Sequence, residues 1–268
     1  MGENDVVSEI KKDHIYALAR EGRRFDGRAF DEYRPIRIQT NLIQQAEGSA
    51  RVQIGDTDVF VGVKMAIGEP YADSPKSGVL TTSAELIPMA SPTFEPGPPR
   101  PAAIELARVV DRGIRETKTI NVEKLCIVEG EKVWMTYVDI HIVDYDGNLF
   151  DAASLGAICA LVSAKVPASK HEVGEDMPMP VDHLPIMTTG LKLGSENAIV
   201  LDPGLAEDQV GGPRLSVSTD ENGDIRAMQK GLVGGLTRNE VKWIVATGRE
   251  RARDIREQVI KATGFSLP

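Results

Sequence analysis

The sequence predicts an α+β fold in which two similar halves pack around one core. Its 268 residues are enough to bury a core of substantial size. Its 41% hydrophobic and 26% charged residues are ordinary for a globular protein. Most directly, a run of short strands followed by helices occurs twice along the chain, and this order is typical of α+β architectures.

The composition also argues against several classes of protein. No uncharged apolar run approaches the roughly 18 residues of a membrane span, and the polar N-terminus differs from a secretory signal peptide. Cys126 and Cys159 lie far apart and outside any CxxC pair, which favours reduced thiols in a cytoplasmic protein over a disulfide. The net charge of −9 argues against a surface coated in basic groups, but it leaves room for a local basic patch.

The first half is expected to begin with a helix and to continue as β-structure. Residues 5–20 predict an amphipathic helix, and the side chains near its apolar face are Val7, Ile10, His14 and Leu18. REGRRFDGR follows as a turn cluster with four arginines. Stretches rich in Val and Ile then predict strands, which are IRIQ, SARVQI, DVFVGVKM and VLTTSAELIPMA.

The middle of the chain predicts a stiff loop, two helices and a hairpin. Six prolines lie from Pro88 to Pro101, so this loop should be extended. Residues 102–118 predict a helix, and LCIVEG with KVWMTYVDIHIVDYDG predicts a β-hairpin with a long second strand. Residues 151–166 are strongly apolar and predict a helix buried on most sides, followed by a polar link to about residue 185.

The second half repeats the order of strands followed by a helix. The expected strands are PIMTTGLKL, NAIVLD, RLSVSTD and IRAMQK. GLVGGL lacks the lysine and hydroxyl of a P-loop and predicts a tight turn. The last helix should start at a capping box of Thr237 and Glu240, bracketed by Leu236 and Val241 as a hydrophobic staple. The expected segments are a helix over 1–22, a first half with its link over 23–185, and a second half over 186–268.

The helix at residues 102–118 carries the strongest functional signal. Arg108, Arg112 and Arg115 fall within about a sixth of its circumference, and we call them the arginine stripe. The apolar side chains that should pack on the sheet lie on a separate face and are Leu106, Val110 and Ile114. Two interpretations of the arginine stripe are open. It is either a solvated face with an i,i+4 pair of Asp111 and Arg115, or a set of guanidinium groups that grip phosphodiester oxygens.

A second motif, DYDGNLFDAASLGA, combines a strand, a turn and a helix N-terminus, where free N–H groups favour anions. A phosphate site would add hydroxyls and an arginine, but this turn offers Asn148, Leu149, Phe150 and Asp151. Two apolar side chains and a carboxylate oppose anion binding. Phosphate is therefore not expected here.

Metal binding is not expected either. The histidines show no ligand spacing with one another or with cysteine, and they are His14, His141, His171 and His183. No arrangement of a nucleophile with a histidine stands out. The sequence therefore implies no cofactor.

Several of these stretches together resemble the RNase PH family of phosphorolytic ribonucleases. They are RRFDGR, EGSARVQIGDTDVFVGVKM, YVDIHIVDYDG with its apolar helix, and IVLDPGLAED. FEPGPP followed by IELARVVDRGIRETK, together with KVWMTYVDIHIVDYDGNLFDA, narrows the resemblance to the non-catalytic RNase PH-like subunits of the archaeal exosome ring. The resemblance covers roughly residues 23–262. It implies an RNase PH-like fold of two βαβα halves, of the ribosomal protein S5 domain 2-like type, around a common core.

The resemblance also implies a chemistry. Active members of the family cut RNA from its 3′ end with inorganic phosphate as the attacking group. A Gly-Thr-Arg type turn before a helix holds the phosphate, a pair of aspartates six residues apart acts near the scissile bond, and arginines on a helix hold the RNA backbone. The active site lies at the seam between two different RNase PH-like subunits.

This sequence departs from the family pattern at two of those three places. The phosphate turn reads Asn148-Leu149-Phe150, which we call the degenerate phosphate turn. The aspartate pair reads Asp208 and Arg214, which we call the degenerate catalytic pair. We expect Arg214 to form an ion pair with Asp208 and to leave no general acid, a loss of about 10²- to 10⁴-fold in rate. The third place is kept, because the resemblance puts Arg108 and Arg112 at helix positions that face RNA in the family, and Arg115 extends the stripe.

The sequence therefore predicts a catalytically silent ring subunit. Its expected partners are a catalytic RNase PH-like paralogue, with which it would alternate in a hexamer of three heterodimers, RNA-binding cap subunits, and single-stranded RNA. No membrane contact is expected. One alternative is an active phosphate-dependent exoribonuclease that works as a homo-oligomer, with Asp208, alone or together with Asp202, as the acid and with phosphate held by other residues. The other is a pure scaffold subunit whose arginines form only surface ion pairs.

Overall fold

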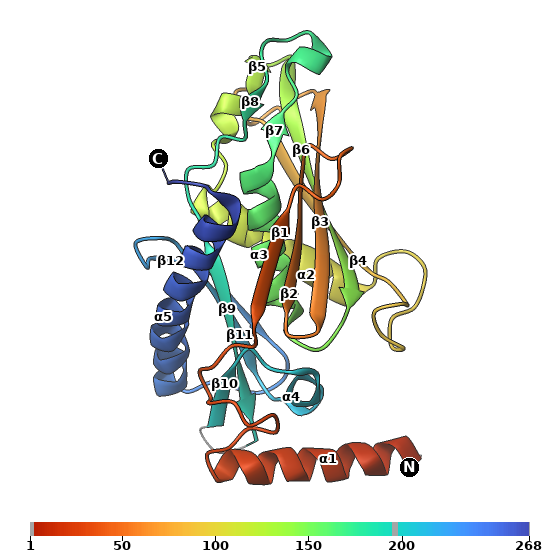
Figure 1. Cartoon of the computed structure of the whole chain (residues 1–268), viewed down its shortest axis with the longest axis vertical. Helices are drawn as coiled ribbons and strands as arrows, with labels where there is room; N and C mark the ends of the chain where they lie inside the picture. The colour runs from red at the N-terminus through yellow and green to blue at the C-terminus, as the bar shows by residue number, and fades with distance from the viewer. Residues whose placement is uncertain (1–2, 195–197, 268) are drawn as a thin grey trace.

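The computed structural model describes residues 3–194 and 198–267 and confirms the α+β prediction (Figure 1). Within these residues two main sheets lie along the long axis of the molecule, with helices between and beside them. The larger sheet has the order β1-β2-β3-β6-β4, with β5 added to β6, and the smaller has the order β10-β9-β11-β12. The two sheets belong mostly to the first and the second half of the chain, respectively.

The strands of the larger sheet follow the expected stretches of Val and Ile. They are β1 (Ile36–Thr40), β2 (Gly48–Ile54), β3 (Thr57–Gly68), β4 (Val79–Leu86), β5 (Cys126–Val128) and β6 (Lys132–Asp144). Neighbours are antiparallel except β4, which runs parallel to β6 and forms one edge. The expected hairpin of β5 and β6 is confirmed. β4 ends at Leu86, so residues 87–90 are a loop and not the end of a strand.

The smaller sheet is antiparallel throughout. Its strands are β9 (Ile186–Leu193), β10 (Ala198–Leu201), β11 (Arg214–Thr219) and β12 (Ile225–Gly231). Asn197, the first residue of the expected strand NAIVLD, lies outside the described residues. The link between the halves holds a small pair of strands, β7 (Lys165–Val166) and β8 (Met177–Pro178), and short 3₁₀ turns lie at Val122–Leu125 and Ser169–His171. β12 forms an edge of this sheet beside α2.

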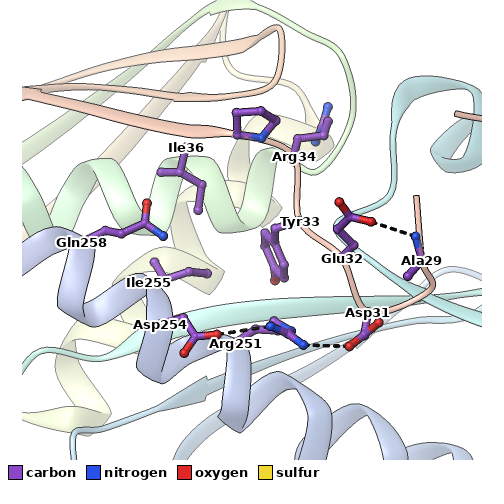
Figure 2. A pocket seen from close by; sticks show the side chains of 11 residues that line it. Ala29, Asp31, Glu32, Tyr33, Arg34, Ile36, Arg251, Asp254, Ile255 and Gln258 are labelled. Atoms are coloured by element: carbon purple, nitrogen blue, oxygen red, sulfur yellow. Dashed lines mark hydrogen bonds and ion pairs between the residues drawn. The ribbon is translucent and has the colours of Figure 1, made fainter. Parts of the chain in front are cut away.

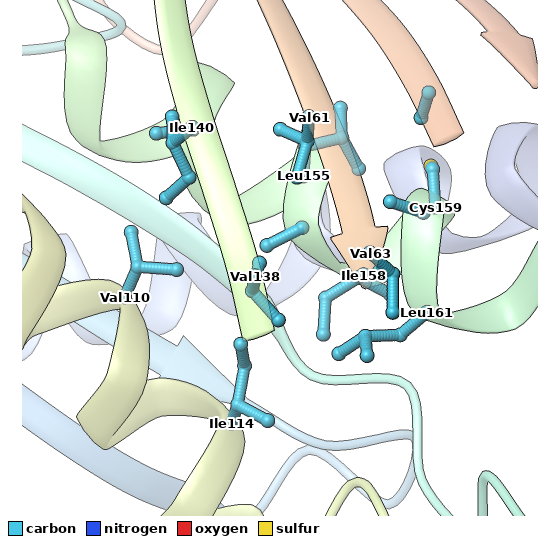
Figure 3. Packing of buried hydrophobic residues seen from close by; sticks show 14 of the residues in the cluster. Val61, Val63, Val110, Ile114, Val138, Ile140, Leu155, Ile158, Cys159 and Leu161 are labelled. Atoms are coloured by element: carbon cyan, nitrogen blue, oxygen red, sulfur yellow. The ribbon is translucent and has the colours of Figure 1, made fainter. Parts of the chain in front are cut away.

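The core is built around α3 (Leu149–Ser163), which packs on β2, β3 and β9 and so contacts both sheets. Every residue from 150 to 161 is buried, which confirms the helix that was expected to be buried on most sides. Figure 3 shows Ile158 and Leu161 of this helix close to Val63 of the sheet. Gly156 allows this approach, because a Cβ there would meet Val61 at 2.8 Å. The helix ends at Ser163, before the expected 166, because Lys165 and Val166 pair with β8.

Two further helices position the candidate site. α2 (Pro101–Thr117) packs on β4, α3 and β12. α5 (Arg238–Thr263) packs on β9 and β11. Its expected capping box is confirmed, because Thr237 Oγ1 accepts from the Glu240 amide and the Glu240 carboxylate accepts from the Thr237 amide. Leu236 and Val241 both pack against the cluster around Ile244.

The apolar face expected for the first helix is wrong. α1 (Glu3–Arg20) lies at one end of the molecule (Figure 1), and its buried residues are Ile15 and Ala19, which pack with Leu191 and Val200. Ile10 is 65% exposed, His14 is exposed and Leu18 is half-buried, while the side chain of Val7 lies outside the described residues. Among the side chains described from Glu9 onward, those that pack on the smaller sheet lie in the last turns of the helix, and they are not the ones on the predicted face. No described helix is both long and apolar enough to cross a membrane.

Candidate functional site

The arginine stripe lies on the outward ridge of α2. The expected packing face is confirmed, since Leu106, Val110 and Ile114 are at most 1% exposed. Arg108 is exposed, and within residues 3–194 and 198–267 no hydrogen bond or ion pair involves it. Its guanidinium is therefore available to an external anion.

The other two arginines of the stripe differ from Arg108. Arg112 is half-buried, and its Nη1 donates to Gln229 Oε1 of β12 at 2.6 Å, so it has a neutral partner. Arg115 forms the expected i,i+4 pair with Asp111 at 3.0 Å and also donates to the Leu80 carbonyl. The hydrogen bond with Asp111 raises the pKa of Arg115. The charge of Arg115 is thus neutralised locally, while those of Arg108 and Arg112 are not.

The degenerate phosphate turn is occupied by protein hydrogen bonds. Asn148 is the N-cap of α3 in a left-handed conformation, and its Nδ2 donates to Asp151 and Asp202, each at 2.8 Å. The preceding Gly147 lies against residues 203–205, where a Cβ would meet the Pro203 carbonyl oxygen at 2.5 Å. The turn before α3 therefore faces buried carboxylates, which oppose the binding of an anion.

Asp202 is the centre of a buried network that joins the two halves. Its carboxylate accepts from Arg34 Nε and Nη2 at 2.9 and 2.7 Å and from Arg28 Nη1 at 2.9 Å. It also accepts from the backbone amide of Arg34 and from Asn148. Burial alone would raise the pKa of Asp202, but the hydrogen bonds and charge of Arg34 outweigh it and hold that pKa below its usual range. Beside it, Arg24 forms a bidentate pair with Glu207, with N···O distances of 2.9 and 2.6 Å.

Sequence reasoning missed the roles of Arg24, Arg28 and Arg34. For Arg24 and Arg28 the signal was present in the turn REGRRFDGR, which is more basic than a connecting turn requires, whereas Arg34 lies outside that turn. Their partners could not be identified, because Asp202 and Glu207 lie more than 160 residues away along the chain. These arginines hold the loop after β10 and are not free to bind a ligand.

Asp151 occupies a second buried site next to this network. Its carboxylate accepts from Tyr33, from Asn148 and from both the amide and the hydroxyl of Thr189. Burial nevertheless raises the pKa of Asp151 to about 6, although these donors act in the opposite direction. The carboxyl is therefore a structural acid whose protonation changes near neutral pH.

The predicted ion pair between Arg214 and Asp208 is wrong. Arg214 Nη2 donates to Glu105 Oε1 of α2 at 2.8 Å, and its guanidinium lies over the Phe150 ring at 3.9 Å from the centroid. Asp208 belongs to the short helix α4 (Leu205–Val210), which the sequence did not predict, and accepts from the Tyr145 hydroxyl at 2.8 Å. Burial raises the pKa of Asp208. Phe150 and Arg214, which stand at the two altered places, thus contact each other.

Little space remains around Phe150, Asp208 and Arg214. A cavity of about 150 Å³ is left, and its lining includes the apolar side chains Leu86, Phe94, Leu106, Leu149 and Phe150. Asp208 and Glu105 also line it, with Arg214 as its basic group. A phosphate ion would face two carboxylates and one guanidinium that is already paired. Across the described residues, no three His, Cys, Asp or Glu side chains gather as ligands for a metal ion.

A larger cavity of about 590 Å³ lies between residues 29–36 and α5. Figure 2 shows Arg251 between Asp31 and Asp254, to which it donates at 2.8 and 3.2 Å. Glu32 adds a third carboxylate to the lining. Because carboxylates predominate there, this cavity does not favour RNA, and the arginine stripe remains the better candidate.

The fold, two sheets packed around α3 with helices beside them, defines an RNase PH-like protein. The chain belongs to the 3′ exoribonuclease family, since the family's domain 1 matches residues 32–167 and its domain 2 matches residues 183–251. The resemblance inferred from the sequence is thereby confirmed.

Relatives of similar length support the same placement. The chain is 53% identical to the exosome complex component Rrp42 of Methanocella arvoryzae, over 95% of this chain and 97% of that protein. It is 49% identical to the protein of the same name from Thermococcus kodakarensis, over 98% and 99% of the two chains. The family relationship therefore extends over nearly the whole sequence.

Solved structures agree with this family assignment. A chain of the Archaeoglobus fulgidus exosome with RNA bound to the active site superposes with a TM-score of 0.91 at 48% identity, covering 94% of this chain and 99% of that one. A chain of an archaeal exosome core gives 0.88 at 43% identity, covering 96% and 99%. Rice Rrp46 gives 0.71 at 20% identity, which shows a shared fold alone.

The buried network predicts a large cost for the loss of one charge. Asp202→Asn would turn an amide toward guanidinium donors and leave Arg34 with only the partly exposed Asp146 as a counter-charge. We expect a loss of about 3 to 5 kcal/mol in the free energy of unfolding at pH 7, measured by urea titration. Asp224→Asn, at an exposed carboxylate, is the control and should change the value by less than about 0.5 kcal/mol. Equal effects of the two changes would contradict the role given to Asp202.

Asp151 predicts a defined pH dependence. Its folded-state pKa of about 6 lies above the ordinary 3.8, so the folded chain binds this proton more tightly than the unfolded chain does. Its contribution to stability is therefore largest below about pH 4 and declines as the pH rises to about 6. The free energy of unfolding of the wild type, minus that of Asp151→Asn, should fall by about 2 to 3 kcal/mol across this window. Urea titrations from pH 4 to 8 measure it, and a flat difference would rule out the raised pKa.

Proposed function

We propose that this chain is a non-catalytic subunit of a phosphorolytic 3′–5′ exoribonuclease of the exosome type. It pairs with a catalytic RNase PH-like paralogue, and three such heterodimers form a hexameric ring that carries RNA-binding cap subunits. Its roles are to complete the active site of the partner and to bind single-stranded RNA. The observation that carries the proposal is the Phe150–Arg214 contact, which joins the two altered places of the site.

The geometry supports a silent subunit for two reasons. The turn before α3 is filled by Asn148 and faces Asp151 and Asp202, so inorganic phosphate has no clamp. Asp208 accepts a hydrogen bond from Tyr145, and the position of the second aspartate holds a guanidinium committed to Glu105. Phosphate and acid groups must then come from the partner. This chain supplies shape and positive charge at the seam.

The arginine stripe is the proposed RNA contact. An exposed guanidinium without a partner binds phosphate oxygens without first breaking an ion pair, and such contacts do not depend on the base. Arg108 meets this condition. Arg112 does not, because it is half-buried and bonded to Gln229, but that partner is neutral and leaves its charge uncompensated. Arg115 is held by Asp111, which favours a structural role for this one arginine. The stripe therefore offers one free guanidinium, one with a neutral partner and one whose charge is already paired.

Phosphate-dependent degradation of a labelled single-stranded RNA tests the silent-subunit proposal. The chain alone should be inactive, and a mixture with the catalytic paralogue should exceed the paralogue alone. Activity that this chain shows alone, with nucleoside diphosphates as products, would support a homo-oligomeric enzyme instead.

Single arginine changes test the RNA contact in the assembled ring. We expect Arg108→Ala to weaken binding of single-stranded RNA regardless of sequence and to reduce the slope of log affinity against log salt by about 0.7. Arg115→Ala, matched in residue type and helix, should have a smaller effect because its charge is already paired. Fluorescence anisotropy over a salt series measures both. Unchanged affinity and slope for Arg108→Ala would indicate a pure scaffold subunit.

A further inference from the structure

The arginine stripe has an acidic neighbour on the same helix. Glu105 lies three residues before Arg108 on α2, and helix side chains three apart are close enough to form ion pairs. Glu105 is half-buried with a 43% exposed side chain, so its carboxylate reaches the surface beside the stripe. Without another partner, the Glu105 carboxylate would neutralise Arg108 and repel the phosphates of an RNA strand. Yet Arg108 has no partner among the described residues.

Arg214 accounts for this. Its Nη2 donates to Glu105 Oε1 at 2.8 Å, across 109 residues of sequence. The guanidinium is itself held in place, because it rests on the Phe150 ring and its side chain is only 11% exposed. Gly231 on the neighbouring strand β12 leaves the space it needs, since a Cβ there would lie 2.5 Å from Nη2. The donor that captures Glu105 is thus fixed by β11, β12 and α3.

We propose that Arg214 is a positioning residue for RNA binding, which draws the Glu105 carboxylate away from the arginine stripe and so keeps Arg108 free for phosphate. This inference rests on the proposed function and assigns a role to the degenerate catalytic pair. The residue that stands in place of an acid acts through Glu105 and does not touch RNA. Its effect is on the charge of the stripe.

A purely structural role is the competing explanation. The same contact ties β11 to the first half of α2, whose N-cap Arg100 makes no capping hydrogen bond. If Arg214 only braces the helix, its loss should weaken RNA binding whether or not Glu105 is charged. If it acts by withdrawing charge, removal of the Glu105 charge should compensate for its loss.

The experiment therefore compares Arg214→Met, Glu105→Gln and the double variant in the ring reconstituted with the catalytic paralogue. The probe is a labelled single-stranded oligoadenylate, and anisotropy gives affinity and salt slope. Lys192→Met is the control, because it breaks an ion pair with Glu240, at 2.7 Å, that joins β9 to α5 as the Arg214–Glu105 pair joins β11 to α2. Thermal unfolding of each ring records stability separately.

We expect Arg214→Met to weaken RNA binding about three- to tenfold and to lower the salt slope by about 0.7, as for the loss of one phosphate contact. The double variant should return to within about twofold of wild type, and Glu105→Gln alone should stay within about twofold. Lys192→Met should leave RNA affinity unchanged at a comparable loss of thermal stability. If Arg214→Met does not assemble, Arg214→Gln, which also removes the charge, is measured with the same expectations.

Two results would overturn the inference. One is an unchanged RNA affinity for the Arg214 variant in a ring where Arg108→Ala weakens binding. The other is a weakened variant that Glu105→Gln fails to rescue, which would leave Arg214 as a brace only. An unchanged affinity for Arg108→Ala itself has a different meaning, because it removes the proposed RNA contact and this inference with it.

Discussion

The structure depends on the burial of one carboxylate. Asp202 is fully buried at the end of β10, with a positive φ of 45°, and its oxygens accept from two arginines, an asparagine and a backbone amide. A buried charge is tolerated only when it is paired and its hydrogen-bonding capacity is satisfied. Arg28 and Arg34 precede β1, while Asp202 follows β10, so this requirement fixes the start of the larger sheet against the smaller one.

The same requirement explains why the turn before α3 does not favour an anion. The turn before α3 points its N-terminus toward Asp202 and Asp151, which take the place that a bound anion would hold. Asn148 connects these two carboxylates through one amide group. The helix dipole that would favour phosphate favours the internal carboxylates instead. The N-terminus of a helix, which can bind anionic ligands, here contacts internal carboxylates and so helps to hold the two halves together.

The sequence was sufficient to predict the structure where local patterns of residues determine it. Stretches rich in Val and Ile predicted the strands, the capping box predicted the start of α5, and a 100° rotation per residue separated the buried face of α2 from its arginines. It was insufficient where the partner lies far along the chain. Arg24 with Glu207, Arg34 with Asp202 and Arg214 with Glu105 join residues more than 100 positions apart. Nothing local marks which acid each arginine selects, and for that reason Arg214 was assigned to its nearer neighbour Asp208.

The contact between Phe150 and Arg214 also bears on how the two positions can change. An aspartate placed at position 214 alone would lie among Asp208, Glu105 and the face of an aromatic ring, with its charge uncompensated. A basic side chain placed at position 150 alone would meet the guanidinium of Arg214, which already has its own acidic partner. Each change is therefore disfavoured unless the other accompanies it, so the two positions are coupled and can be exchanged only together.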